Sequence, residues 1–189
     1  MVEFFSKWIT PNQLTALRVM LIPVIYILVF LNTEQLLVVA WALFTVACFT
    51  DYWDGVLARH TGKTTDLGKL LDPIADKILI VSLLVLLVSL ERAPAYLTVL
   101  IIMREFAISG LRSIAAVNGT VIAASSGGKI KTISQMVAVG LLILHYPMLG
   151  IPFHDFGIVA LWIATAISIW SGIRYFISYY QSASAKANS

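Results

Sequence analysis

Four aspartates lie within or beside apolar stretches of this chain, where a charged side chain is unfavourable. Asp51 and Asp54 lie near the end of one apolar run, and Asp72 and Asp76 lie near the start of the next. An aspartate at the centre of a membrane helix costs about 2.5–3.5 kcal/mol on the insertion scale. Residues of this kind normally face a cavity and mark a functional site, so these four are the first candidates for chemistry.

The spacing of the aspartates predicts a metal centre. On a helix, Asp51 and Asp54 lie about 60° apart, and Asp72 and Asp76 about 40° apart, so each pair shares one face. If the two helices are antiparallel neighbours, the four carboxylates can converge, and they would repel one another without cations. Two divalent cations about 3.5–4 Å apart would relieve this repulsion and form a phosphoryl-transfer centre. Hard oxygen ligands favour Mg²⁺ or Mn²⁺.

Small residues and an arginine stand between the two aspartate pairs. Gly55 and Gly68 have no side chain, so a ligand or a neighbouring helix can approach the backbone closely. Ala58 is nearly as small, and Arg59 carries a planar fork suited to a phosphate. This frame is typical of a site that binds a phosphorylated ligand.

The elements that must hold these residues are membrane helices. The 189 residues are 59% hydrophobic and only 12% charged, against roughly 25% charged in an average soluble domain. A span needs about 20 apolar residues, and six such runs are present. We expect an all-α, polytopic membrane protein whose residues 1–189 form a single domain. The predicted spans cover about residues 12–31, 36–59, 66–90, 94–119, 130–145 and 156–180.

The segments between and after these spans are predicted as connections. Residues 1–8 are interpreted either as a short interfacial helix or as a frayed terminus. Residues 125–128 are expected to be a flexible connector, and the chain is expected to end in a small polar tail.

The basic residues alternate along the chain. Arg92 is the one basic residue in the connections after the first, third and fifth spans. The other basic residues of the terminal and alternate connecting regions are Lys7, Arg18, Arg59, Lys63, Lys69, Arg112, Lys129, Lys131, Arg174 and Lys186. By the positive-inside rule, both termini and the aspartates are predicted to lie on the cytoplasmic side of the membrane.

The aspartate region resembles the signature of the CDP-alcohol phosphatidyltransferase family. Every fixed position of that signature is matched by Asp51-x2-Asp54-Gly55-x2-Ala58-Arg59-x8-Gly68-x3-Asp72-x3-Asp76. Shorter motifs are similar to those of bacterial phosphatidylglycerophosphate synthases and extend the likeness over about residues 12–135. They are Asn12-Gln13-Leu14-Thr15-x2-Arg18, Arg104-Glu105, Ser109-Gly110-Leu111-Arg112 and Gly128-Lys129-x-Lys131-Thr132-x2-Gln135.

The resemblance implies a reaction, a set of partners and a role for most of these residues. The expected reaction transfers the phosphatidyl group of CDP-diacylglycerol to sn-glycerol 3-phosphate, in a bacterial cell membrane and in a homodimer, with no nucleic acid involved. The implied metal ligands are Asp51, Asp54, Asp72 and Asp76, with Asp76 also taking the proton of the acceptor hydroxyl. The implied CDP-binding residues are Gly55, Ala58, Arg59, Asp66 and Gly68. The implied acceptor-phosphate residues are Arg104, Arg112, Lys129 and Lys131, while Asn12, Thr15 and Arg18 lie near the site without an assigned role.

Several alternatives stay open at this point. The acceptor could be inositol phosphate, phosphatidylglycerol or serine, although a basic pocket argues against serine. A divalent-cation transporter would also place aspartates in membrane helices, but the chain shows no internal repeat of the kind common in transporters.

Some candidate residues also have a structural interpretation. Lys129 and Lys131 could serve topology alone, and Glu105 need not pair with Arg104, because adjacent helix residues do not face each other. Ordinary interfacial, anchoring or packing roles are expected for His60, His145, His154, Trp41, Trp53, Trp162, Trp170 and Cys48.

Overall fold

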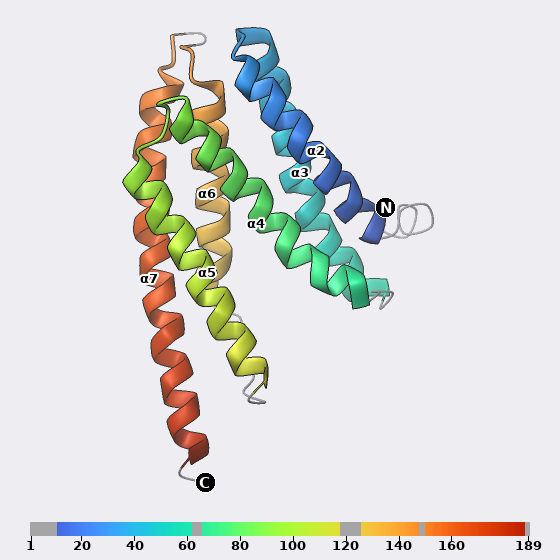
Figure 1. Ribbon diagram of the computed structural model, residues 1–189, viewed down its shortest axis with the longest axis vertical. Coiled ribbons are helices and arrows are strands. Elements are labelled where there is room, and N and C mark those ends of the chain that lie inside the picture. Colours follow the sequence, from blue (N-terminus) through green and yellow to red (C-terminus); the bar gives the residue numbers. More distant parts are fainter. Residues whose placement is uncertain (1–10, 62–65, 118–125, 148–149, 188–189) are drawn as a thin grey trace.

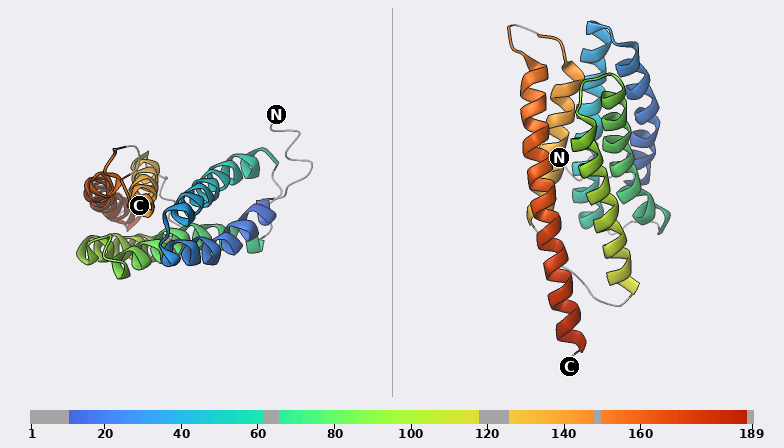
Figure 2. Two further views of the ribbon diagram at one scale, coloured as in Figure 1. Left: turned by 90° about the horizontal axis from the view of Figure 1, so that it is seen from above. Right: turned by 60° about the vertical axis from the view of Figure 1, so that its left-hand side comes forward.

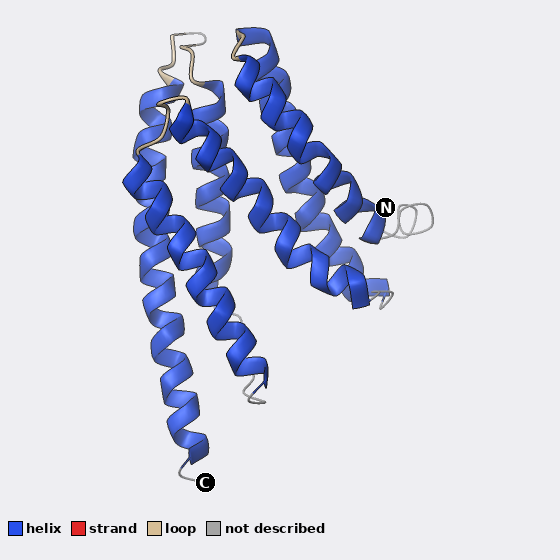
Figure 3. Cartoon of the chain, viewed as in Figure 1, coloured by secondary structure: helices blue, strands red, loops and turns tan. Residues whose placement is uncertain are grey.

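The computed structural model describes the backbone of residues 11–61, 66–117, 126–147 and 150–187. Side chains are described for the same residues except 11–15, 51–61, 66–76, 116–117, 126–127 and 182–187. Apart from one isolated bridge residue, the regular structure of these ranges is helical (Figure 3). The helices are α2 (Pro11–Leu31), α3 (Glu34–Thr61), α4 (Asp66–Ser89), α5 (Ala95–Val117), α6 (Ser126–Leu144) and α7 (Phe153–Ala187).

The helix boundaries agree with the sequence-based expectation to within a few residues, with two exceptions. The segment 125–128 was expected to be a flexible connector, but α6 already begins at Ser126 and includes Gly128. The tail was expected to follow residue 180, but α7 continues to Ala187. Small residues such as Ser and Ala reduce hydropathy without preventing helix formation, since Ala has the highest helix propensity. The predicted interfacial helix over residues 1–8 lies outside the described residues.

Helices α2 and α3 form one antiparallel pair and α6 and α7 another, and α4 crosses diagonally between the two pairs. α2 packs along α3, and α6 packs most extensively along α7, while α5 lies against α7 and α4 contacts α2, α5 and α6 (Figures 1 and 2). The apolar core is continuous across this arrangement. Its fully buried members include Ile25 of α2, Ala40 of α3, Leu83 of α4 and Leu142 of α6.

The alternating direction of the helices separates the molecule into two ends. At one end, the upper one in Figure 1, lie the connections α2–α3, α4–α5 and α6–α7. At the opposite end α3 finishes, α4 begins, α5 finishes and α7 finishes (Figure 1). The aspartate-bearing segments of α3 and α4 therefore lie at the same end of the molecule as the basic end of α5.

The buried Arg92 joins the α4–α5 connection to the end of α6 and to the α2–α3 connection by hydrogen bonds. Arg92 is 2% exposed and donates one hydrogen bond to the Ile143 carbonyl at 3.3 Å and another to the side-chain oxygen of Asn32. The Tyr146 hydroxyl donates to the same Asn32 oxygen at 3.4 Å. This inward role explains why an arginine occurs in a connection that the positive-inside rule would leave without one.

Two of the histidines for which interfacial roles were expected lie side by side, His145 directly after α6 and His154 in the first turn of α7. Nδ1 of His145 lies 3.2 Å from Nδ1 of His154, with the two rings edge to face. Burial lowers the pKa of His145, and the positive charge of Arg92 and the neighbouring His154 lower it further. The interfacial interpretation of His60 concerns a side chain outside the described residues.

One helix within the described ranges meets the length and hydropathy needed to cross a bilayer. It is the segment Phe153–Gln181 of α7. Shorter apolar segments occur in α2, α3 and α4, over Ala16–Leu31, Glu34–Thr50 and Lys77–Ser89. Large apolar side chains are also widely exposed, among them Met20, Met103 and Phe106 at 64–70% exposure.

Candidate active site

The predicted metal ligands lie on the helices that the sequence predicted. Asp51 and Asp54 belong to the second half of α3, and Asp72 and Asp76 to the first half of α4. Their side chains lie outside the described residues, so convergence of the four carboxylates stays a prediction. The structure likewise describes only the backbone of the remaining predicted residues of this region. They are the CDP-binding candidates Gly55, Ala58, Arg59, Asp66 and Gly68 and the first-span residues Asn12 and Thr15.

Arg104 projects from α5 onto α7 and makes three hydrogen bonds through three different nitrogens. Its Nε donates to the Ser168 carbonyl at 3.1 Å, and one terminal nitrogen donates to the Ser171 hydroxyl at 2.9 Å. The other terminal nitrogen donates to Glu105 at 3.2 Å. Gly172 provides the space, since a Cβ built there would lie 3.2 Å from Arg104 Cγ. Arg104 is therefore fixed by α7, and its side chain is only 13% exposed.

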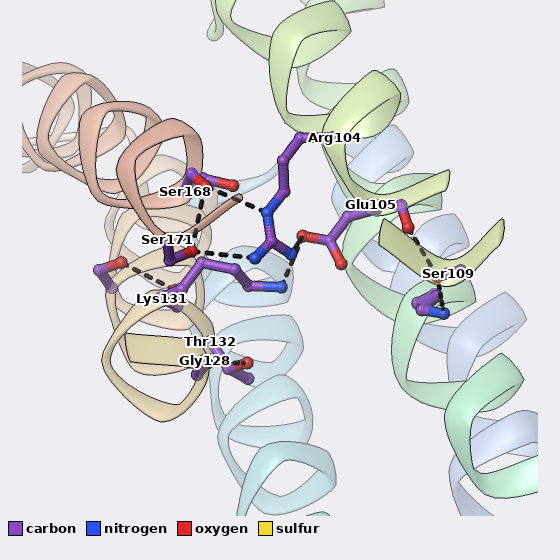
Figure 4. A network of polar contacts seen from close by, with 10 residues as sticks. Arg104, Glu105, Ser109, Gly128, Lys131, Thr132, Ser168 and Ser171 are labelled. Carbon is purple, nitrogen blue, oxygen red and sulfur yellow. Dashed lines mark hydrogen bonds and ion pairs between the residues drawn. The ribbon is translucent and has the colours of Figure 1, made fainter. Parts of the chain in front are cut away.

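Glu105 joins α5 to α6 through Lys131. The Lys131 ammonium donates to Glu105 Oε1 at 2.5 Å, and the same oxygen accepts the bond from Arg104 (Figure 4). Both the Glu105 and the Lys131 side chains are 10% exposed. The sequence left open whether Glu105 pairs with Arg104, and the structure shows that it does. Long side chains leaving a helix in different directions can still bend until their ends meet.

A second polar link runs from α4, which carries two of the predicted metal ligands, to α5. Lys77, which directly follows Asp76 in α4, donates to the Ser109 hydroxyl, and that hydroxyl donates to the Glu105 carbonyl at 2.6 Å. The link connects the middle of α4 with the basic network on α5. It was not predicted, because Lys77 lies outside the family signature.

The other two acceptor-phosphate candidates lie on the surface. The Arg112 guanidinium is 5.3 Å from the centre of the Tyr175 ring of α7, and it lies close enough to Arg104 for the two charges to repel. Lys129 is exposed near the start of α6. The structure thus brings Arg104 and Lys131 together on one carboxylate oxygen, with Arg112 nearby, whereas Lys129 is placed only at the same end of α6 as Lys131.

Sequence reasoning missed the contribution of α7. Thr165, Ser168 and Ser171 recur every third residue and are 3%, 0% and 2% exposed. Residues three apart share one face of a helix, so this polar stripe faces the protein interior and receives Arg104. Small hydroxyl residues at that spacing within an apolar helix were the available signal.

Arg18 of α2 is 1% exposed and belongs to the largest fully buried side chains in the described part of the chain. A buried guanidinium within an apolar helix is rare without a specific role. Whether Arg18 lies near the site stays a prediction, because the side chains of the aspartates lie outside the described residues.

Comparison with known proteins places the chain in a family. Residues 8–170 match the sequence profile described as CDP-alcohol phosphatidyltransferase. A Bacillus subtilis protein named CDP-diacylglycerol–glycerol-3-phosphate 3-phosphatidyltransferase is 40% identical over 181 residues, covering 88% of this chain and 92% of the relative. Proteins of the same name from Rickettsia typhi and Haemophilus influenzae are 38% and 39% identical, covering 88% and 89% of this chain and 94% and 92% of the relatives. With the signature residues in place on α3 and α4, the chain belongs to the CDP-alcohol phosphatidyltransferase family.

Proposed function

We propose that this protein transfers the phosphatidyl group of CDP-diacylglycerol to sn-glycerol 3-phosphate, giving phosphatidylglycerophosphate and CMP. The observation that carries the proposal is the similarity to relatives named for this reaction, at about 40% identity over 88% of the chain. The buried basic network on α5 and α6 supports it, since a phosphorylated acceptor needs cations in a site of limited solvent access. The same transfer to inositol phosphate or phosphatidylglycerol is the alternative that this network leaves open.

The aspartates supply the donor set of the proposed metal site. The chemistry of that set fits the metal, because carboxylate oxygens at helical spacing suit Mg²⁺ or Mn²⁺ rather than softer ions. Asp51, Asp54, Asp72 and Asp76 would hold two such ions. Bound there, the ions would neutralise the pyrophosphate of the donor and the charge that develops on the departing CMP.

The other residues of the signature bind and orient the donor in this proposal. Gly55, Ala58 and Gly68 leave room for the CDP moiety, which Arg59 and Asp66 would contact. Asp76 takes the proton of the acceptor hydroxyl. The hydroxyl oxygen then forms a bond to the lipid-side phosphorus, the bond from this phosphorus to the bridging oxygen breaks, and CMP leaves with the electron pair. Positioning and electrostatics contribute most to phosphoryl transfer.

The acceptor phosphate is assigned to the basic end of α5 and α6. Lys131, Arg112 and Lys129 would contact it directly, with Arg104 contributing its charge from the position that α7 fixes. The Lys77–Ser109 link supports this arrangement, since it joins α5 to the residue of α4 that directly follows Asp76. The proton acceptor and the phosphate site would then face the same substrate molecule.

The proposal places the protein in the cell membrane as a multi-pass homodimer. The widely exposed apolar side chains and the membrane-length segment of α7 support the membrane location. The alternation of basic residues supports cytoplasmic termini and a cytoplasmic active site. Single cysteines introduced at Asn32 and at Lys63, in a variant lacking Cys48, should be labelled from outside the cell at Asn32 only. Labelling at position 63 alone would show that the orientation in the membrane is opposite to the proposed one.

The reaction itself is tested with purified enzyme, CDP-diacylglycerol and glycerol 3-phosphate. CMP release should require both substrates and a divalent cation, and the lipid product should have the mass of phosphatidylglycerophosphate. Asp76→Asn should abolish release, while Glu34→Gln, at the opposite end of α3, should leave it unchanged. CMP release that does not depend on glycerol 3-phosphate would refute the acceptor assignment.

A further inference from the structure

A carboxylate lies in the middle of the basic network, which is unexpected for a site that binds an anion. Glu105 is 8% exposed and accepts bonds from Lys131 at 2.5 Å and from Arg104 at 3.2 Å on one oxygen. Its negative charge opposes the binding of any phosphate near the same two cations. The inference drawn from this arrangement rests on the proposed function.

The charged groups of Arg104 and Lys131 are held close together, whether or not a ligand is bound. Arg104 is fixed by the Ser168 carbonyl and the Ser171 hydroxyl, and Lys131 is buried beside it. Two like charges held in a poorly hydrated site repel strongly unless an anion lies between them. Glu105 provides that anion while no acceptor is bound.

We propose that Glu105 is a positioning residue that sets the affinity of the acceptor site, because the acceptor's phosphate must compete with its carboxylate for Lys131. It acts through Lys131 and Arg104 and not by contact with the substrate. Its presence weakens the binding of every phosphate to the site, including free inorganic phosphate and the phosphorylated headgroup of the product. The site therefore releases its product readily and is not blocked by cellular phosphate.

The test uses Glu105→Gln and inorganic phosphate as the probe, in purified full-length enzyme. The amide keeps the shape and one accepting oxygen but removes the charge. Phosphate is measured as a competitive inhibitor against glycerol 3-phosphate. Its inhibition constant should fall roughly 10- to 100-fold, because one opposing charge near a dianion is lost. The KM for glycerol 3-phosphate should fall with it, kcat should decrease, and the KM for CDP-diacylglycerol should stay unchanged.

Two further variants separate charge from geometry. Glu105→Asp keeps the charge but shortens the side chain, so its inhibition constant should stay within about threefold of the wild type. Glu105→Gln is also measured in an Arg104→Met background, where one of the two cations is absent and the repulsion that Glu105→Gln would create is smaller. Adding Glu105→Gln to that background should again tighten phosphate binding by about tenfold or more.

The outcomes distinguish the inference from the function on which it rests. If the wild type uses glycerol 3-phosphate and is inhibited by phosphate, but Glu105→Gln binds phosphate equally or more weakly in both backgrounds, the inference alone is overturned. A fall of the inhibition constant in Glu105→Asp as large as in Glu105→Gln would overturn it as well. A wild type that neither uses glycerol 3-phosphate nor binds phosphate overturns the proposed function, and the inference with it.

Discussion

Removing the charge of Arg112 should weaken acceptor binding without a comparable effect on the donor. Its guanidinium lies over the Tyr175 ring at 5.3 Å, on the exposed side of α5. A cation–π contact at an exposed site contributes about 0.5–1 kcal/mol. A charge-assisted hydrogen bond to a phosphate contributes about 1.5–3 kcal/mol. If Arg112 contacts the acceptor, Arg112→Gln should therefore raise the KM for glycerol 3-phosphate roughly 10- to 100-fold.

Arg174 is the matched control for this experiment. It is likewise exposed and lies over an aromatic ring, with its guanidinium 5.1 Å from the centre of Trp170. Arg174→Gln thus removes one charge and one cation–π contact, as Arg112→Gln does, but at a position with no predicted role in the acceptor site. The KM values for glycerol 3-phosphate and CDP-diacylglycerol are measured for both variants by steady-state kinetics. Equal changes in the two variants, or equal changes in both KM values of Arg112→Gln, would refute the assignment.

Three further predictions concern the metal site, the histidine pair and helix packing. Asp54→Asn or Asp72→Asn should abolish CMP release from protein that still inserts, and chelation of the wild type should do so reversibly; full turnover in chelator would exclude the two-metal proposal. Because the pKa of His145 is lowered, the folded state binds fewer protons than the unfolded chain, so the free energy of unfolding should fall as the pH drops below about 6.5. His145→Gln should flatten this dependence, and an unchanged profile in His145→Gln would contradict the assignment. Gly157→Ala should lower the melting temperature, since its Cβ would lie 2.8 Å from a side-chain carbon of Leu142 and 3.1 Å from the Leu142 backbone nitrogen, and overpacking costs about 1–3 kcal/mol. Gly110→Ala, which meets nothing within 4 Å, should instead stabilise α5 by up to about 1 kcal/mol, and a similar effect of both substitutions would count against the packing argument.

The helices were predictable because each consists largely of an apolar run, and polar residues separate one run from the next. α2 begins at Pro11, as the residue's preference for the first helical turn predicts. The start of α6 was misjudged, because Gly127 and Gly128 suggested a connector although glycine is tolerated in the first turn of a helix. Local composition could not resolve this, since the extensive packing of α6 along α7 depends on the tertiary structure.

The sequence predicts the part of the candidate site that one segment carries, but not the contacts at which several segments meet. The two aspartate pairs and Arg59 form a motif within a single stretch of sequence. The pairing of Glu105 with Lys131 depends on how α6 is placed against α5, which sequence spacing does not specify. The same is true of the Ser168 and Ser171 contacts of Arg104, because they require α7 to present its polar stripe to α5. Lys77 was overlooked for a related reason, since its partner Ser109 lies 32 residues away in the chain.

The proposed reaction joins a phosphatidyl group to glycerol 3-phosphate. The most direct test incubates the purified protein with CDP-diacylglycerol, a divalent cation and one acceptor at a time, namely glycerol 3-phosphate, inositol phosphate, phosphatidylglycerol or serine. The kcat/KM for CMP release is measured for each, and the lipid product is identified by mass. Glycerol 3-phosphate should exceed every other acceptor by at least about tenfold, with phosphatidylglycerophosphate as the product, since the other acceptors lack either its phosphate or its size. A higher kcat/KM with any other acceptor would contradict the proposed function.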